Sequence, residues 1–402
     1  MSSSKSGLSK TRLDRMHKAV EGYVGSGEVV GAITLIHRHG ETHVDVVGLQ
    51  DRERKIKLKR DTIFRIASMT KPITAAAAMM LVEGAKLRLD EPVDRLLPEL
   101  ADRKVLNRLD GPLDDVTPVR RPITLRDLLT FRMGFGMTLG PPDTPLQIAM
   151  NESQIMGLNP PPPHDPDAWI AKLGALPLMH QPGERWMYHT GSDVLGVLIA
   201  RASGKPFETF LKERIFEPLG MKDTGFSVPA GKIGRLSSCY GVNAKTGALE
   251  LIDDARASNW AKPPAFAAGG GGLVSTVDDY LAFGRMMLGY GKLGKERILS
   301  RPAVQAMTTD QLTAEQKAAS PFFPGFWDNR GWGFGLSPIT ARNGVPMNPG
   351  RFGWDGAFGT SWASDPGEDM VSVLMIQRMG FGPQPAGLNT DFWTLAYQAI
   401  DD

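Results

Sequence analysis

The apolar positions near the start of the chain follow two different periods. Over residues 8–24 they recur every three or four positions, as at Met16 and Val20, which is typical of an amphipathic helix. Residues 29–37 and 42–49 are instead rich in β-branched and apolar side chains, with a His-Gly turn between them. The pattern predicts a helix followed by a β-hairpin.

The middle of the chain changes to helical patterns. Pro72 falls in the first turn of one predicted helix, where its missing N–H is not needed. Residues 136–182 are irregular and rich in proline. A segment this long without periodicity often covers a site or binds a ligand, and a surface excursion is the alternative. After a short strand at 63–66, helices are expected over 68–84, 123–131, 191–202, 207–216 and within 275–288.

The C-terminal part of the chain returns to strand patterns. A final helix is expected over 391–400. The two ends of the chain therefore supply strands and the middle supplies helices, which favours one sheet built from both ends. The expected C-terminal strands are 331–336, 353–358, 360–364 and 370–376.

Composition and charge narrow the possible functions. The chain has 402 residues, of which 42% are hydrophobic, and a formal net charge of +2. A balance this even gives no electrostatic reason to expect a nucleic-acid partner or an anionic membrane. The seven histidines show no metal-ligand spacing, so we expect no metal and no cofactor. A small-molecule substrate is the expected partner, and the sequence carries no indication of the oligomeric state.

Cysteine content and segment hydrophobicity bear on the compartment. The single cysteine, Cys239, excludes an internal disulfide. The sequence contains no recognisable secretory signal and no apolar run long enough for a transmembrane helix. We therefore expect a cytoplasmic protein, with a processed secreted protein as the alternative.

The strongest candidate chemistry is the pair Ser68 and Lys71 at the start of a predicted helix. Three positions apart, the two side chains share one face of the helix. A serine hydroxyl needs a neighbouring base to act as a nucleophile, and burial among apolar residues lowers the pKa of a lysine towards neutrality. The same Ser-x-x-Lys pattern occurs at Ser2 and Lys5, so context rather than pattern singles out Ser68.

Two further segments carry candidate groups. Tyr188 follows the irregular segment and precedes a predicted helix, where its phenol can project into a cleft and relay protons. The sequence Trp354-Asp355-Gly356-Ala357 ends a predicted strand. A glycine there lets a substrate approach the backbone, and the following N–H can form an oxyanion hole with the N–H of the nucleophile. Ordinary packing is the alternative for both segments.

Together these segments resemble the β-lactamase-like serine hydrolases, which include class C β-lactamases, penicillin-binding carboxypeptidases and family VIII carboxylesterases. Ser-x-x-Lys is a mark of that group, and the stretches ITLRDLLTF, PGERWMYHTGSDVLG and GGGGLVSTVDDYLAFGRMML also match. The resemblance implies an α+β, β-lactamase/transpeptidase-like fold in a single catalytic unit of residues 1–402. Its antiparallel sheet, flanked by helices, would come from 1–89 and 231–402. A mainly helical subdomain would span 90–230, with the active site in the cleft between the two.

The resemblance also implies roles for the candidate residues. Ser68 would be the acylated nucleophile and Lys71 its general base. Tyr188 would share the base role and protonate the leaving group. The backbone N–H groups of Ser68 and Ala357 would form the oxyanion hole, and attack by water would complete the cycle.

Departures from the β-lactamase pattern bear on the substrate. Thr190 stands where those enzymes have Asn, and a usual His is missing near Phe131. Trp354-Asp355-Gly356 replaces a Lys-Thr-Gly motif whose lysine attracts the β-lactam carboxylate. A Trp in this motif resembles the family VIII carboxylesterases. Substrate contacts are therefore expected from Trp354, Asp355, Gly356, Thr190, His189 and Phe131.

The sequence thus predicts a serine carboxylesterase that acts on small carboxylic esters through an acyl-enzyme, with weak or no β-lactamase activity. One alternative is an acyltransferase, or a hydrolase of amides or D-amino-acid peptides, on the same machinery. Another is a non-catalytic penicillin-recognising or sensing protein. A Gly-x-Ser-x-Gly nucleophile elbow is absent from the sequence, so an α/β-hydrolase has no support.

Overall fold

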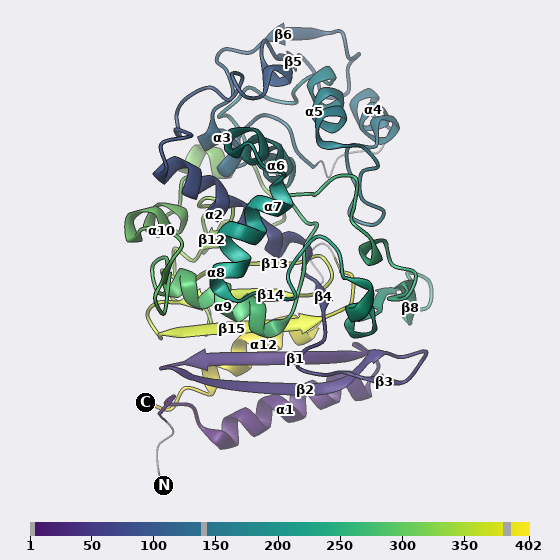
Figure 1. The fold of residues 1–402 in the computed structure, drawn as a ribbon, viewed down its shortest axis with the longest axis vertical. Helices are drawn as coiled ribbons and strands as arrows, with labels where there is room; N and C mark the ends of the chain where they lie inside the picture. The colour runs from purple at the N-terminus through teal and green to yellow at the C-terminus, as the bar shows by residue number, and fades with distance from the viewer. Residues whose placement is uncertain (1–4, 138–142, 381–386) are drawn as a thin grey trace.

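The computed structural model describes residues 5–137, 143–380 and 387–402, which are organised around one seven-stranded antiparallel sheet (Figure 1). The strand order is β12-β13-β14-β15-β1-β2-β3, so the N-terminal hairpin pairs with strands from the far end of the chain. The prediction of an α+β fold with an antiparallel sheet from both chain ends is confirmed. The strands are β1 Gly31–Arg38, β2 Glu41–Asp51, β3 Ile56–Lys57, β12 Ser337–Pro338, β13 Phe352–Asp355, β14 Ser361–Asp365 and β15 Met370–Ile376.

The central strands β1 and β15 are buried on both faces. Ala32 and Ile36 of β1 pack in the core formed by α1 (Lys10–Gly25) and α12 (Gly387–Gln398), which cover one face of the sheet. Ile33 and Leu35 face the larger core on the opposite side. Since successive side chains of a strand point to opposite faces, burial on both sides explains why these segments are continuous apolar runs.

Helix α2 (Thr70–Glu83) lies inside the larger core, between the sheet and α6 (Thr190–Ser203) (Figure 1). Its alanines are fully buried, and such small side chains allow neighbouring helices to approach closely. Helix α9 (Val277–Leu288) packs on the same face of the sheet. None of the helices in the described ranges combines the length and apolarity needed to cross a membrane. Further helices are α3 Leu125–Leu129, α4 Pro145–Ser153, α5 Pro166–Ala175, α7 Phe207–Leu211, α8 Glu217–Leu219, α10 Arg301–Met307 and α11 Ala314–Ala318.

The proline-rich segment 136–182 is more ordered than its sequence predicts. It contains α4 and α5, so the prediction of a wholly irregular segment is wrong, although residues 138–142 lie outside the described residues. Both helices begin with a capping residue followed by proline. Thr144 accepts a hydrogen bond from the backbone N–H of Gln147, and Asp165 accepts one from that of Ala168. Proline is favoured directly after such a cap because its fixed φ suits a helix start.

The expected strand at 331–336 is also absent, and pairing begins instead at β12. Two glycines in this segment adopt tight turns against the helical core. A Cβ on Gly333 would lie 1.9 Å from the carbonyl oxygen of Met307. Gly335 has φ +71° and donates its N–H to the carbonyl of Leu129. These close contacts, rather than a sheet ladder, determine the path of the segment.

A buried ion pair fixes the strand that leads into Ser68. Arg65 lies in β4 (Phe64–Arg65), which pairs with β9 (Val274–Ser275). Its guanidinium contacts Asp253 at 2.6 Å and also donates to Gln377 Oε1 at 3.0 Å and Ser258 Oγ at 3.0 Å. Arg65 is fully buried, so these contacts replace the water that an exposed guanidinium would bind.

Removing the partner of this buried cation is expected to destabilise the fold. Asp253→Ala leaves Arg65 buried and uncompensated, which typically costs about 3–5 kcal/mol in unfolding free energy. The neighbouring Asp254→Ala breaks a pair with Arg54 at the surface and is the matched control, expected to change stability little. Urea unfolding of both variants measures the difference. Equal losses of unfolding free energy in the two variants would show that the buried Arg65–Asp253 pair contributes no more to stability than the surface pair.

Candidate active site

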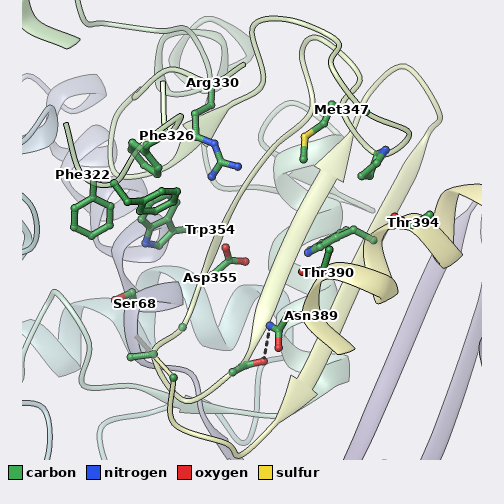
Figure 2. Close-up of a pocket in the computed structure, with 18 of the residues that line it drawn as sticks. Ser68, Phe322, Phe326, Arg330, Met347, Trp354, Asp355, Asn389, Thr390 and Thr394 are labelled. Carbon is green, nitrogen blue, oxygen red and sulfur yellow. Dashed lines mark hydrogen bonds between the residues drawn. The ribbon is translucent and has the colours of Figure 1, made fainter. Parts of the chain in front are cut away.

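Ser68 lies in a tight turn, η1 (Ala67–Met69), that continues directly into α2. Ala67 has φ +43°, a left-handed conformation that residues other than glycine rarely adopt. The turn is fixed by a hydrogen bond from Met69 N–H to the Ile66 carbonyl and by one from Tyr280 Oη to the Met69 carbonyl. Ser68, labelled at the left of Figure 2, thereby faces a cavity of about 880 Å³.

Lys71 is fully buried and its amino group has three polar neighbours. Nζ lies 2.9 Å from Ser68 Oγ, 2.5 Å from the carbonyl oxygen of Gly270 and 3.1 Å from His189 Nδ1. It also lies 4.5 Å from the centre of the Tyr188 ring. Burial lowers the pKa of Lys71 from 10.5 to about 7, against a smaller raising effect of Asp193. A substantial fraction of the amine is therefore neutral at neutral pH.

His189 is held by Asp193 one turn further along α6. Its Nε2 lies 3.1 Å from an Asp193 oxygen, so the carboxylate favours the tautomer in which Nε2 carries the proton and Nδ1 is an acceptor. The other Asp193 oxygen accepts the Gly270 N–H at 2.7 Å. His189 has φ +86°, which is unusual for a residue with a Cβ and turns its side chain towards Lys71.

These contacts determine where the lone pair of a neutral Lys71 points. A neutral amine has two N–H donors and one lone pair. The Gly270 carbonyl and His189 Nδ1 can only accept hydrogen bonds, so they take both N–H groups. The lone pair is then directed at Ser68 Oγ, the one neighbour of the three that can donate. This arrangement can transfer a proton from the serine hydroxyl to the amine.

The glycine run at 269–272 allows this close packing. A Cβ on Gly269 would lie 2.3 Å from the Ser192 carbonyl oxygen, and one on Gly270 would lie 2.9 Å from Asp193 Oδ1. The run therefore passes between α2 and α6 where no side chain fits. Because these glycines have no side chains, the Gly270 carbonyl can lie beside Lys71.

Tyr188 lies beside both Ser68 and Lys71. Its hydroxyl hydrogen-bonds to Ser68 and accepts a bond from Trp354 Nε1 at 2.7 Å. Burial raises the pKa of Tyr188 well above its usual range, so the phenol stays protonated at neutral pH. A protonated phenol can donate a proton but is poorly suited to removing one.

The end of β13 brings the Trp354–Ala357 segment beside Ser68. Gly356 donates its N–H to the Thr360 carbonyl, and a Cβ at this position would lie 2.4 Å from the Ile66 carbonyl oxygen. The strand therefore ends at Asp355, earlier than the expected residue 358, and turns. Within the described ranges the Ala357 N–H has no hydrogen-bond acceptor, and Ala357 lines the same cavity as Ser68.

Not every residue expected to contact substrate reaches the cavity. Phe131 and Thr190 are fully buried behind it. The Phe131 ring packs 5.8 Å from that of Tyr188, and Thr190 Oγ1 donates to the sulfur of Met156. His189 contacts Lys71 rather than the cavity wall. The residues that do line the cavity are Ser68, Tyr188, Trp354, Asp355, Gly356 and Ala357.

Sequence reasoning missed two parts of the cavity wall, one from α12, with Asn389, Thr390 and Thr394, and one from an aromatic segment. The segment 320–347 contributes Phe322, Phe326, Arg330 and Met347 (Figure 2). Its dense aromatic composition, SPFFPGFWDNRGWGFG, is the signal that could have drawn attention to it. Cys239, by contrast, is buried away from the site, and burial raises the pKa of its thiol to about 12.

This combination of fold and cavity is that of the β-lactamase-like serine hydrolases. Residues 16–391 match the family described as Beta-lactamase, and the chain belongs to that family.

Similar proteins include enzymes that act on esters. An uncharacterised protein from Mycobacterium tuberculosis is 39% identical, over 91% of this chain and 90% of its own length. Esterase EstB from Burkholderia gladioli is 30% identical, over 88% of this chain and 87% of the esterase. The solved structure of a simvastatin synthase mutant from Aspergillus terreus has a TM-score of 0.79 at 25% identity, covering 98% of this chain and 95% of that one.

The burial of Lys71 predicts a specific pH dependence of stability. Its pKa is about 7 in the folded protein and near 10.5 when unfolded, so between these values the unfolded state binds more protons. Stability that depends on Lys71 therefore rises with pH through this window. Relative to Lys71→Met, the unfolding free energy of the wild type is expected to increase by about 4 kcal/mol between pH 6 and pH 10.

Urea unfolding at several pH values measures this difference. The exposed Lys86, which follows α2, supplies the control variant Lys86→Met, whose offset from the wild type is expected to stay nearly constant with pH. If the difference in unfolding free energy between wild type and Lys71→Met were also constant with pH, the Lys71 amine would be solvated and charged in the folded protein.

Proposed function

We propose that this protein is a serine carboxylesterase in which Ser68 forms an acyl-enzyme with small carboxylic esters and water then releases the acid. The observation that carries the proposal is the 2.9 Å contact between Ser68 Oγ and a buried Lys71 amine, at the wall of a large cavity. The similarity to esterase EstB supports an ester as substrate.

In the proposed acylation step, Ser68 Oγ attacks the carbonyl carbon of the ester while its proton passes to the Lys71 lone pair. The carbonyl oxygen becomes an oxyanion, which accepts hydrogen bonds from the N–H groups of Ser68 and Ala357. Collapse of this intermediate breaks the bond to the alcohol oxygen, which takes a proton and leaves. Water repeats the same steps on the acyl-enzyme and releases the acid.

Tyr188 is proposed to donate a proton rather than to share the base role. Its pKa is raised by burial, and its hydroxyl is next to Ser68 Oγ, where the alcohol oxygen departs. The proton that it gives to the leaving group can be replaced from the Lys71 ammonium formed in the same step. Trp354 Nε1 stabilises the partial negative charge on the phenol oxygen through its hydrogen bond.

The wall beside Ser68 argues for esters over β-lactams. At the position of the lysine that attracts a β-lactam carboxylate there is Trp354, whose indole N–H is already used by Tyr188. The next residue, Asp355, is exposed and hydrogen-bonded to Ser361 Oγ. A carboxylate placed against this strand meets a negative charge instead of a positive one. We therefore propose weak or no β-lactamase activity.

Acyl transfer is the second candidate. The acyl-enzyme is the same, but an alcohol rather than water accepts the acyl group. The similarity to a simvastatin synthase structure and the 880 Å³ cavity, which has room for an acceptor, favour testing it. Turnover of a p-nitrophenyl ester in the presence of a primary alcohol, with the products weighed by mass spectrometry, distinguishes a new ester from free acid.

The nucleophile is tested by covalent labelling. Wild-type protein is expected to react with a fluorophosphonate at Ser68 and to hydrolyse p-nitrophenyl esters, whereas Ser68→Ala loses both, because no other group can carry the acyl chain. Ser2→Ala, which removes the second Ser-x-x-Lys match, is expected to keep both. Peptide mapping of the labelled protein identifies the modified residue, and a label elsewhere would overturn the assignment.

His189 is proposed as a positioning residue for Lys71. His189→Phe removes the acceptor Nδ1 and leaves the lone pair undirected, so kcat/KM is expected to fall by about 10²–10³-fold. His189→Asn keeps an acceptor oxygen near Lys71 Nζ and is expected to recover much of the rate. For the wild type, kcat/KM should rise with pH to a plateau above about 7, following the Lys71 amine. Equal losses in the two variants, with an unchanged pH profile, would contradict the positioning role.

A further inference from the structure

Arg330 places a positive charge in the wall of the cavity that holds Ser68. Its backbone pairs with Ile339, and its guanidinium lies 5.2 Å from the centre of the Phe326 ring. Figure 2 shows the side chain extending from the aromatic segment towards Asp355. Arg330 is therefore fixed by a bridge and a ring stack, with the guanidinium turned to the cavity.

Apart from its stack on Phe326, the guanidinium has no hydrogen-bond or salt-bridge partner within the described ranges. Its Nε is buried without a hydrogen bond, and no carboxylate lies within 4.0 Å. Arg65, whose Nε is likewise buried without a hydrogen bond, differs in that its guanidinium is fully buried and pairs with Asp253 at 2.6 Å, whereas Arg330 is half-buried. Burial lowers the pKa of Arg330, yet an arginine remains ionised at neutral pH. A buried polar group without a partner is rare in proteins and calls for an explanation.

Other charged groups near the cavity do not satisfy Arg330. Asp355 is close enough to act on it electrostatically, but its Oδ1 accepts the hydroxyl of Ser361. Arg351 adds a repulsive positive charge. Arg378, which also lines the cavity, is 3.8 Å from Glu28. Within the described residues, the Arg330 guanidinium therefore has the charge of Asp355 nearby but no carboxylate in direct contact with it.

We propose that Arg330 binds a carboxylate of the substrate, so that the preferred substrates are esters bearing a second, ionised carboxyl group. This inference rests on the proposed esterase function and names the substrate class for it. The planar guanidinium presents N–H groups in a fork that matches a carboxylate. The surrounding Phe322, Phe326 and Trp354 exclude water, which strengthens the attraction.

The proposal is compatible with weak β-lactamase activity. The missing lysine of the β-lactam motif belongs to β13, beside Ser68, whereas Arg330 belongs to the aromatic segment 320–347, which forms another part of the cavity wall. A carboxylate at Arg330 is separated from the reacting carbonyl by the Phe326 and Trp354 side chains lining the cavity. We expect a flexible chain of a few methylenes to follow this apolar stretch more readily than a rigid bicyclic lactam.

Matched esters test the proposal. The probes are the p-nitrophenyl hemiester of glutaric acid, with a carboxylate on the acyl side, 4-carboxyphenyl pentanoate, with one on the alcohol side, and the neutral p-nitrophenyl pentanoate. Arg330→Met is expected to lower kcat/KM about 10–100-fold for one anionic ester and to leave the neutral ester within about twofold. The affected ester shows which side of the substrate carries the anion. Arg342→Met removes an exposed arginine and is the control.

Binding of glutarate, followed by calorimetry, gives a readout that needs no turnover. Wild type is expected to bind it and Arg330→Met to bind about tenfold more weakly or worse. Equal losses for the anionic and neutral esters, or unchanged glutarate binding, would overturn the proposal and leave Arg330 as a packing partner of Phe326. If no ester is hydrolysed and Ser68 resists labelling, yet glutarate binds through Arg330, the esterase assignment fails and the anion site stands.

Discussion

The amino group of Lys71 is held by three groups that come from three separate parts of the chain. The Ser68 hydroxyl lies one turn earlier, the Gly270 carbonyl lies in the glycine run, and His189 lies at the start of α6. No carboxylate lies within 4.0 Å of Nζ in the described part of the chain. The neighbours of Lys71 therefore suit a neutral amine better than a charged one. The glycine run and the start of α6 both have to lie against α2 for these neighbours to reach the amino group.

Desolvation of Lys71 links the fold to the chemistry. Burial that lowers its pKa to about 7 costs free energy whenever the amine is protonated. The apolar core around α2 and the buried pair of Arg65 with Asp253 stabilise the surroundings that enforce this burial. A looser core would admit water and return the pKa of Lys71 towards 10.5, and Lys71 could then no longer serve in the proposed role of base.

Local patterns predicted the parts of this arrangement that depend on neighbouring residues. The apolar runs of β1 and β15 and the three-residue spacing of Ser68 and Lys71 are both local. The contact of His189 with Lys71 is not, because it joins residues 118 positions apart and depends on a left-handed backbone at His189. A contact between residues so far apart leaves no periodic pattern in the sequence, so the sequence alone does not predict it.

Helices α4 and α5 were missed for a different reason. Each starts with a cap and a proline, at Thr144-Pro145 and Asp165-Pro166. The prolines that suggested an irregular segment were in fact marking helix starts. In this segment the density of prolines concealed a local signal, whereas at 331–336 alternating apolar residues suggested a strand that tertiary packing of glycines prevents.

Trp354 shows how one replacement changes several properties of the site. Compared with a lysine, it removes a positive charge, adds an aromatic wall and donates a hydrogen bond to Tyr188. The Trp332 ring packs 4.7 Å from it, and Phe326 lies beyond. The same aromatic layer that occupies the position of the missing cation also supports Arg330 further along the cavity. If Arg330 binds a substrate carboxylate as proposed, charge recognition lies in the aromatic segment 320–347 rather than in the strand beside Ser68.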